Sequence, residues 1–225
     1  MKTMDDIKII DVKQSVFEDN NKDADLLRER LKSEKTFLLN LMSSPGSGKT
    51  TLLLALTEKL SARIKFAIME ADIDSAVDAE TMRNAGVDTI QIHTGGMCHL
   101  DADMTRQGLN AIQSEKYDLI ILENVGNLVC PAEFDTGAVK NMTILSVPEG
   151  HDKPLKYPLM YENCQLLVIN KIDVLPYFDF DCDRVVEYAR MRNPDIKIIF
   201  ASAKNGDGID EIADWMLENV DKWIK

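Results

Sequence analysis

One stretch of the sequence decides the fold: Ser43-Ser44-Pro45-Gly46-Ser47-Gly48-Lys49-Thr50-Thr51. It follows an apolar run at residues 37–42 and opens a helical pattern at residues 50–62, which is the setting of a phosphate-binding loop. Gly46 and Gly48 allow backbone N–H groups to turn toward a phosphate, and the positive end of the following helix attracts the same anion. The stretch therefore predicts a P-loop nucleotide-binding fold.

The residues of this loop predicted to hold the phosphates are Gly46, Ser47, Gly48, Lys49, Thr50 and Thr51. Lys49 would reach the β- and γ-phosphates, and the Thr50 hydroxyl would ligate magnesium (Mg2+). The generic pattern begins with glycine where this chain has Ser43, so the match is imperfect at its first position. The loop alone does not distinguish ATP from GTP.

Outward from the loop, short apolar runs alternate with longer amphipathic stretches, which is typical of a mostly parallel sheet flanked by helices. Runs rich in Ile, Leu and Val predict buried strands at residues 37–42, 65–70, 89–93, 119–123, 143–147, 166–170 and 197–201. Helices are predicted at residues 50–62, 76–85, 103–114, 181–192 and 209–223. The fold class is α/β. Residues 1–35 are predicted to form an N-terminal arm with a short helix at 25–32, and residues 36–225 a nucleotide-binding domain with metal-binding loops.

The composition argues against several kinds of partner. Of the 225 residues, 26 are Lys or Arg and 38 are Asp or Glu, so the net charge is -12 and the surface repels nucleic acid and anionic lipid. No run approaches the roughly 20 apolar residues that a membrane-spanning helix needs, and the first residues lack the apolar core of a signal peptide. The chain is expected to be cytoplasmic, with no nucleic-acid or membrane partner.

Guanine is favoured over adenine by Asn170-Lys171-Ile172-Asp173, which ends the apolar run at residues 166–169. The Asp173 carboxylate can accept hydrogen bonds from N1–H and the 2-amino group of guanine. Adenine offers no such pair, and a desolvated carboxylate left unpaired rejects ATP strongly. Ser202-Ala203-Lys204 completes the predicted base pocket, with the Ala203 N–H available to the guanine oxygen. GTP and GDP are therefore the expected nucleotides, bound through Asn170, Lys171, Asp173, Ser202, Ala203 and Lys204.

Two carboxylates at predicted strand ends, Asp72 and Glu123, are candidates for binding magnesium and the attacking water. With Lys49 they form the predicted catalytic set, and with Thr50 the predicted magnesium ligands. Asp74 and Asp78 compete for the same role, and helix capping is an ordinary alternative use of Asp72. The segment after Glu123, at residues 124–127, contains a glycine that could move with the γ-phosphate.

Cys98, His99 and Cys130 form a candidate metal site. Cys98 and His99 are adjacent, and two neighbouring residues can face one ion only in a turn or at a helix start. Two thiolates and an imidazole suit zinc (Zn2+) or nickel (Ni2+) and leave a tetrahedron one ligand short, so water, an exogenous ligand or a second subunit could supply the fourth ligand. On spacing alone, two buried thiols and a polar histidine are the better interpretation. Cys164 and Cys182 are expected to be structural.

Several segments together resemble the nickel-incorporation GTPases of hydrogenase maturation: SPGSGKTT (44–51), MCHLDA (97–102), ENVGNLVCP (123–131), DKPLKYP (152–158) and NKID (170–173). The likeness extends over residues 36–225. It implies a SIMIBI-class G domain that hydrolyses GTP, related to the signal-recognition and nitrogenase-iron-protein GTPases. It also implies that Cys98, His99 and Cys130 bind nickel or zinc at the interface of a homodimer.

The same resemblance implies delivery of nickel to the hydrogenase large subunit, with a small zinc-containing nickel accessory protein as partner. Some members carry an N-terminal Cys-x-x-Cys-Gly-Cys site or a histidine-rich tract, and neither occurs in the present sequence, whose histidines are His93, His99 and His151. Nickel handling is therefore expected to depend on the metal site of the nucleotide-binding domain or on the partner.

The short connection between Glu123 and Cys130 suggests how the two sites communicate. GTP would draw residues 123–127 toward the γ-phosphate and move Cys130 relative to Cys98 and His99. Three alternatives are an assembly factor with structural zinc, a urease-type nickel accessory GTPase, and a small-molecule kinase. The urease type typically carries Cys-Pro-His, which is absent here, and a kinase would prefer ATP, against which residues 170–173 argue.

Overall fold

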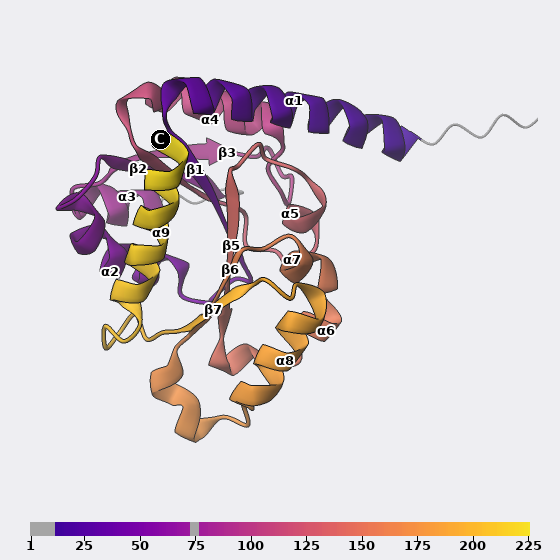
Figure 1. The fold of residues 1–225 in the computed structure, drawn as a ribbon, viewed down its shortest axis with the longest axis vertical. Helices are drawn as coiled ribbons and strands as arrows, with labels where there is room; N and C mark the ends of the chain where they lie inside the picture. The colour runs from indigo at the N-terminus through magenta and orange to yellow at the C-terminus, as the bar shows by residue number, and fades with distance from the viewer. Residues whose placement is uncertain (1–11, 73–76) are drawn as a thin grey trace, which may run out of the picture.

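The structure, a computed structural model, describes residues 12–72 and 77–225 and places a seven-stranded sheet in that part of the chain (Figure 1). Neighbouring strands are parallel and follow the order β3-β2-β4-β1-β5-β6-β7, so the chain winds outward from β1 in both directions. The strands are β1 Phe37–Ser43, β2 Phe66–Asp72, β3 Asp88–His93, β4 Leu119–Glu123, β5 Lys140–Ser146, β6 Leu166–Asn170 and β7 Lys197–Phe200. Ligands of such sheets bind at the carboxyl ends of the strands.

Helices connect the strands. Their bounds are α1 Val12–Glu34, α2 Lys49–Ser61, α3 Val77–Asn84, α4 Ala102–Ile112, α5 Cys130–Glu133, α6 Lys153–Lys156, α7 Pro158–Glu162, α8 Cys182–Arg192 and α9 Ile209–Ile224, with short 3-10 helices at Ser114–Lys116, Val147–Glu149 and Ile172–Tyr177. Carboxylates cap two of them: Asp101 accepts from Met104 N at the start of α4, and Asp181 accepts from two N–H groups of α8.

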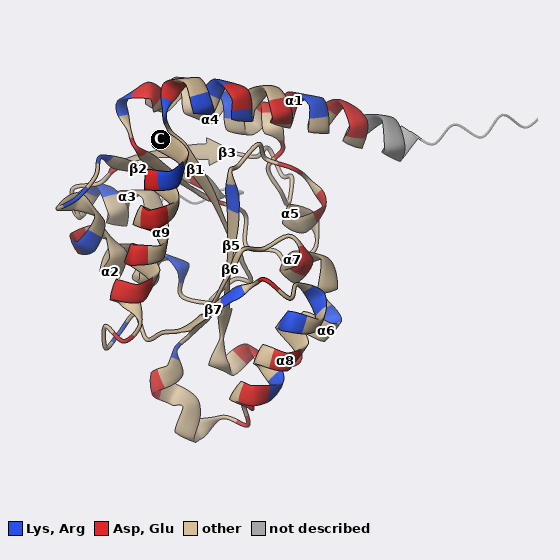
Figure 2. Ribbon diagram, in the orientation of Figure 1, with Lys and Arg blue, Asp and Glu red and all other residues tan. Residues whose placement is uncertain are grey.

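The core lies on both faces of the sheet, because β1, β4 and β6 are buried along their whole length. Side chains from α2, α3 and α9 cover one face. The other face is covered in two halves, one by α1 and α4 and the other by α5, α7 and α8 (Figure 1). Charged residues lie mainly on the surrounding helices and loops (Figure 2). Among the described helices, none is long and apolar enough to span a membrane.

Each predicted strand is present with small shifts, the largest at β5, which begins at Lys140 and not at Thr143. The short helix predicted at residues 25–32 was wrong in extent, because α1 runs from Val12 to Glu34. Its buried positions, Ala24, Leu27 and Leu31, recur at helical spacing and pack over β1 and α4, while the rest of the helix is polar. The division of the chain at residue 35 stays a prediction.

Candidate nucleotide and metal sites

The predicted phosphate loop joins β1 to α2. Gly46 and Gly48 have positive φ values of 74° and 97°, in the region that favours glycine. A Cβ on Gly48 would also lie only 2.7 Å from Nδ2 of Asn170, so no larger residue fits there. The Lys49 amine, 13% exposed at the side chain, donates to Ser43 Oγ at 3.0 Å and lies 4.0 Å from Glu123 Oε1. The loop thus points a lysine toward the carboxyl ends of β1 and β4.

The segment after β6 is held directly against this loop. Asn170 Nδ2 donates to the Ser47 carbonyl at 3.0 Å, and the Lys171 amine donates to the Gly46 carbonyl at 2.7 Å. Asn170 is buried, and Lys171 has a positive φ of 63°. These contacts make the phosphate loop and the predicted base-recognition segment one continuous surface.

A cavity of about 300 Å³ lies between these two segments. It is lined by Gly48, Thr51, Asn170, Lys171, Asp173, Val174, Ala203 and Lys204. Ser202 is buried beside it and donates its hydroxyl to Asp173 Oδ1 at 2.7 Å, which orients the carboxylate. The Ala203 N–H, predicted to face the guanine oxygen, donates to Asn170 Oδ1 at 3.4 Å. Residues from three separate segments of the sequence therefore line one cavity.

The two predicted carboxylates are the last residues of β2 and β4. Glu123 ends β4 and is buried, and Thr50 lies in the first turn of α2. Asp72 is the last residue of β2, but its side chain, like that of Asp78 and the whole of Asp74, lies outside the described part of the chain. Whether these carboxylates hold magnesium stays a prediction.

Two further carboxylates near the loop were not predicted. Glu70 is buried in β2 and is the register partner of Glu123 on β4. Glu149, after β5, accepts a hydrogen bond from the hydroxyl of Ser44 in the phosphate loop. A charged residue within an apolar strand pattern was the available signal for Glu70. Glu149 had no such signal, since its contact with the loop depends on the fold.

The predicted metal ligands lie together at the same edge of the sheet. Cys98 and His99 occupy the turn between β3 and α4, and Cys130 is the first residue of α5. The Cys98 thiol donates to Cys130 Sγ, 2.8 Å away, and lies 4.0 Å from His99 Nδ1. One ligand atom from each of the three residues lies within 4.8 Å of the others, and all three residues are partly exposed. This donor set fits a thiophilic divalent ion with an open coordination position.

Burial and a hydrogen bond shift the pKa values of two of these groups. Burial lowers the pKa of His99, against smaller opposing effects of Asp101 and Glu133, and so favours the neutral imidazole that binds metals. The hydrogen bond with Cys98 and then burial raise the pKa of the Cys130 thiol, so a metal ion must displace a proton there. Burial raises the pKa of Cys164 to about 12, which fits its predicted structural role.

Taken together, the sheet order, the loop after β1 and the segment after β6 define a P-loop nucleotide-binding protein. Residues 37–200 match the model of the CobW/HypB/UreG nucleotide-binding domain. The hydrogenase maturation factor HypB of Azotobacter chroococcum is 44% identical over 93% of this chain and 68% of its own length. The chain belongs to the HypB hydrogenase maturation factors of the CobW/HypB/UreG family.

Solved structures agree with this assignment. The crystal structure of HypB from Helicobacter pylori in complex with nickel has a TM-score of 0.86 and 38% identity, and the match covers 91% of this chain and 96% of that one. The signal recognition particle receptor FtsY of Elizabethkingia anophelis, in complex with GDP, has a TM-score of 0.54 at 13% identity, over 95% of this chain and 77% of that one. The second likeness shows that the two proteins share a fold.

Proposed function

We propose that this protein is a metal-binding GTPase that assists delivery of nickel into [NiFe] hydrogenase, and that GTP hydrolysis rearranges the site formed by Cys98, His99 and Cys130. Membership of the HypB maturation factors, one of which has been crystallised with nickel, supports the assignment. The observation that carries the coupling is the short segment at residues 123–130, which begins at the nucleotide site and ends at the metal site.

This segment touches both sites. At one end, Glu123 Oε1 lies 4.0 Å from the Lys49 amine. In the middle, a Cβ on Gly126 would lie 3.1 Å from Cγ of Pro45 and 3.3 Å from its nitrogen, so the segment packs closely on the phosphate loop. At the other end, Cys130 Sγ lies 2.8 Å from Cys98 Sγ. A movement of the segment with the γ-phosphate would therefore change the distance between the two thiols.

The residues around the phosphate loop fit hydrolysis of GTP. Lys49 and the backbone N–H groups of the loop would stabilise charge on the transferred phosphoryl group. Thr50, Glu123 and Asp72 would hold magnesium, which offsets negative charge on the phosphates when bound. Asp173, oriented by the Ser202 hydroxyl, would select guanine by accepting two hydrogen bonds from the base.

The metal site also supports a homodimer. It offers three ligands, and two apolar side chains next to them are exposed, Met97 by 41% and Val129 by 50%. A second copy of the chain would cover these side chains and could complete the coordination. The small zinc-containing accessory protein and the hydrogenase large subunit are the proposed partners, and the net charge of -12 favours a basic surface on a partner.

The test is titration of the metal-free protein with nickel and with zinc, in GDP and in a non-hydrolysable GTP analogue, beside a Cys98→Ala, Cys130→Ala double variant. We expect the affinity for nickel to differ between the nucleotides by about 5- to 150-fold, the usual range of allosteric coupling, and the difference to vanish in the variant. Equal affinity in both nucleotides would instead identify an assembly factor with structural zinc.

A further inference from the structure

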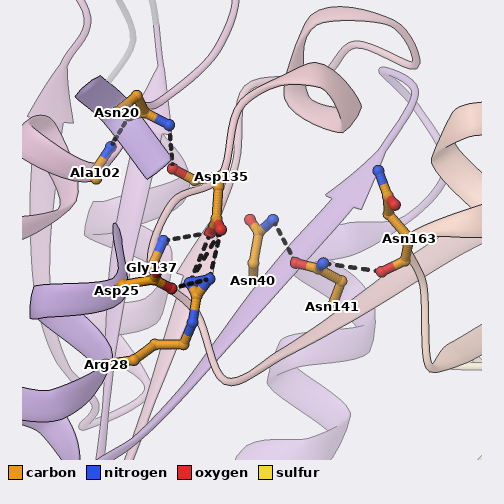
Figure 3. Close-up of polar contacts among 9 residues, drawn as sticks. All are labelled: Asn20, Asp25, Arg28, Asn40, Ala102, Asp135, Gly137, Asn141 and Asn163. Atoms are coloured by element: carbon orange, nitrogen blue, oxygen red, sulfur yellow. Dashed lines mark hydrogen bonds and ion pairs between the residues drawn. The ribbon is translucent and has the colours of Figure 1, made fainter. Parts of the chain in front are cut away.

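Helix α1 contacts both segments that carry the metal ligands. Asn20 lies between them: its Oδ1 accepts from Ala102 N at 3.0 Å, and its Nδ2 donates to the Asp135 carbonyl at 2.9 Å (Figure 3). Ala102 opens α4 shortly after Cys98 and His99. Asp135 follows α5 shortly after Cys130. One side chain therefore bridges the backbones of two segments whose cysteines are 32 residues apart in sequence.

An ion pair strengthens the second of these contacts. Arg28 Nη1 donates to both carboxylate oxygens of Asp135, at 3.0 and 3.1 Å (Figure 3). The same carboxylate accepts from Gly137 N at 2.9 Å, which fixes the turn after α5. The Arg28 side chain is 29% exposed and that of Asp135 is 36% exposed, so the pair is partly shielded from water. A forked pair of this kind constrains orientation as well as distance.

Aromatic rings extend the contact to the metal ligand itself. The ring of Phe17 on α1 lies 4.8 Å from that of Phe134, centroid to centroid. The ring of Phe134 stacks on the imidazole of His99 at 3.7 Å, with 14° between the ring planes. We call the contacts of Phe17, Asn20 and Arg28 the α1 brace.

We propose that the α1 brace sets the relative position of the metal ligands, with Asn20 and Arg28 as positioning residues. Cys98 and Cys130 lie on separate connections of the sheet, and connecting segments are in general more mobile than the strands and helices that they join. The brace ties the two connections to one rigid helix. Residues that orient metal ligands without touching the metal typically account for about 10- to 100-fold in affinity.

The inference rests on the proposed metal-binding function, so its test has one readout with nickel and one without. The variants are Asn20→Ala and Arg28→Met, with Arg28→Lys as the conservative replacement. Arg30→Met is the matched control, because Arg30 lies on the same helix but contacts Glu34, Asn110 and Ser114, away from the metal ligands. The affinity for GDP and the thermal unfolding of each variant report on general damage.

The first readout is titration of the full-length, metal-free protein with nickel ion alone, followed by thiolate-to-nickel charge-transfer absorption. We expect about 10-fold weaker nickel binding in Asn20→Ala and Arg28→Met. Arg28→Lys should recover part of the loss, Arg30→Met should bind as the unchanged protein does, and the affinity for GDP should stay the same in all four. If nickel binding is lost in the Cys98→Ala, Cys130→Ala double variant, and so depends on these thiols, unchanged nickel affinity and absorption in both Asn20→Ala and Arg28→Met would overturn the inference.

The second readout needs no metal. In a Cys182→Ser background, the protein is equilibrated with glutathione: Cys98 and Cys130 lose two electrons and two protons to form a disulfide, and one oxidised glutathione becomes two thiols. The equilibrium constant measures how well the brace holds the two thiols together. An equilibrium constant about 10-fold lower in both Asn20→Ala and Arg28→Met, with no change in Arg30→Met, supports the brace. This holds even if nickel binds elsewhere, a result that would overturn only the proposed function. No drop overturns the brace, whatever the metal does.

Discussion

The nucleotide site and the metal site lie at the same edge of one sheet but are positioned in different ways. The nucleotide-site residues follow β1, β6 and β7 directly, and contacts such as Asn170 to Ser47 join neighbouring strand ends. The proposed metal ligands lie on two connections that are joined by contacts from α1, outside the central sheet. The first site is therefore fixed by the order of the strands, whereas the second depends on packing between distant segments and can move more easily.

The largest effect, a loss of GTP hydrolysis, should come from Lys49→Ala, which changes the nucleotide site and leaves the metal site intact. Lys49 is the lysine expected to contact the β- and γ-phosphates, and removal of one such positive group costs about 100- to 1000-fold in turnover. We expect GTP hydrolysis to fall by that factor while the affinity for nickel in the absence of nucleotide is unchanged. Phosphate release measures the loss. Lys59→Ala is the control, because Lys59 lies on the same helix as Lys49 but pairs with Asp210 at the surface. Equal loss in both variants would contradict the assignment.

Asp173→Asn should change which base the first site selects. The amide keeps one acceptor for the N1–H but replaces the other acceptor by a donor, so it opposes the guanine 2-amino group and matches xanthine, which keeps the N1–H and has an oxygen in place of the amino group. We expect about 100-fold weaker GDP binding or more, and a gain in xanthosine diphosphate binding. Calorimetric titration with both nucleotides checks this, with the exposed Asp179→Asn as control. Loss of both affinities would show that Asp173 acts only through folding.

This difference between the two sites also explains which of their features could be predicted from the sequence. The phosphate loop and residues 170–173 were predicted at the correct strand ends because each is a short, continuous pattern whose place follows from the strand that precedes it. The cysteine spacing alone favoured two unrelated thiols, since nothing local in the sequence shows that residues 32 apart come within 2.8 Å. For the same reason the length of α1 and its contacts through Asn20 and Arg28 were missed: they are non-local.

Gly137→Ala should loosen the second site while the first site stays intact. Gly137 has φ +75°, and a Cβ there would lie 2.7 Å from Cδ2 and 3.1 Å from Cβ of Leu27, so the Leu27 side chain or the helix α1 that carries it must shift. Gly86 has φ +83° with nothing within 4 Å of such a Cβ, so Gly86→Ala carries only the backbone cost of about 1 kcal/mol. We expect Gly137→Ala to lower the free energy of unfolding by about 2–3 kcal/mol in urea titration. It should also weaken nickel binding but not GDP binding. Equal effects of the two variants would argue against close packing of α1 on this turn.

Asparagine side chains offer a second connection between the sites. Asn124, next to Glu123, donates to Asn40 at 3.1 Å, and Asn40 donates to Asn141 at 3.0 Å. Asn141 donates to the Asn163 carbonyl at 2.9 Å, and the Asn163 side chain donates to the Ala132 carbonyl in α5 at 3.0 Å. Figure 3 shows the middle of this chain. It runs beside a cavity of about 310 Å³ that Asn40, Asn141 and Asn163 help to line.

The smallest effect, and the sharpest test of the comparison, should come from Asn141→Ala. The substitution removes the middle of the chain without touching a nucleotide or metal residue, so each site should keep its own affinity within a few-fold. If the chain carries part of the coupling, the ratio of nickel affinities between the GTP-analogue and GDP states should fall about 3-fold, within the range measured for residues between coupled sites. Asn219→Ala is the control, because Asn219 donates to the Trp215 carbonyl within its own helix, α9. An unchanged ratio of nickel affinities would assign the coupling to the backbone of residues 124–130 alone. The loosely held metal site would then respond to nucleotide only through the segment that joins it to β4.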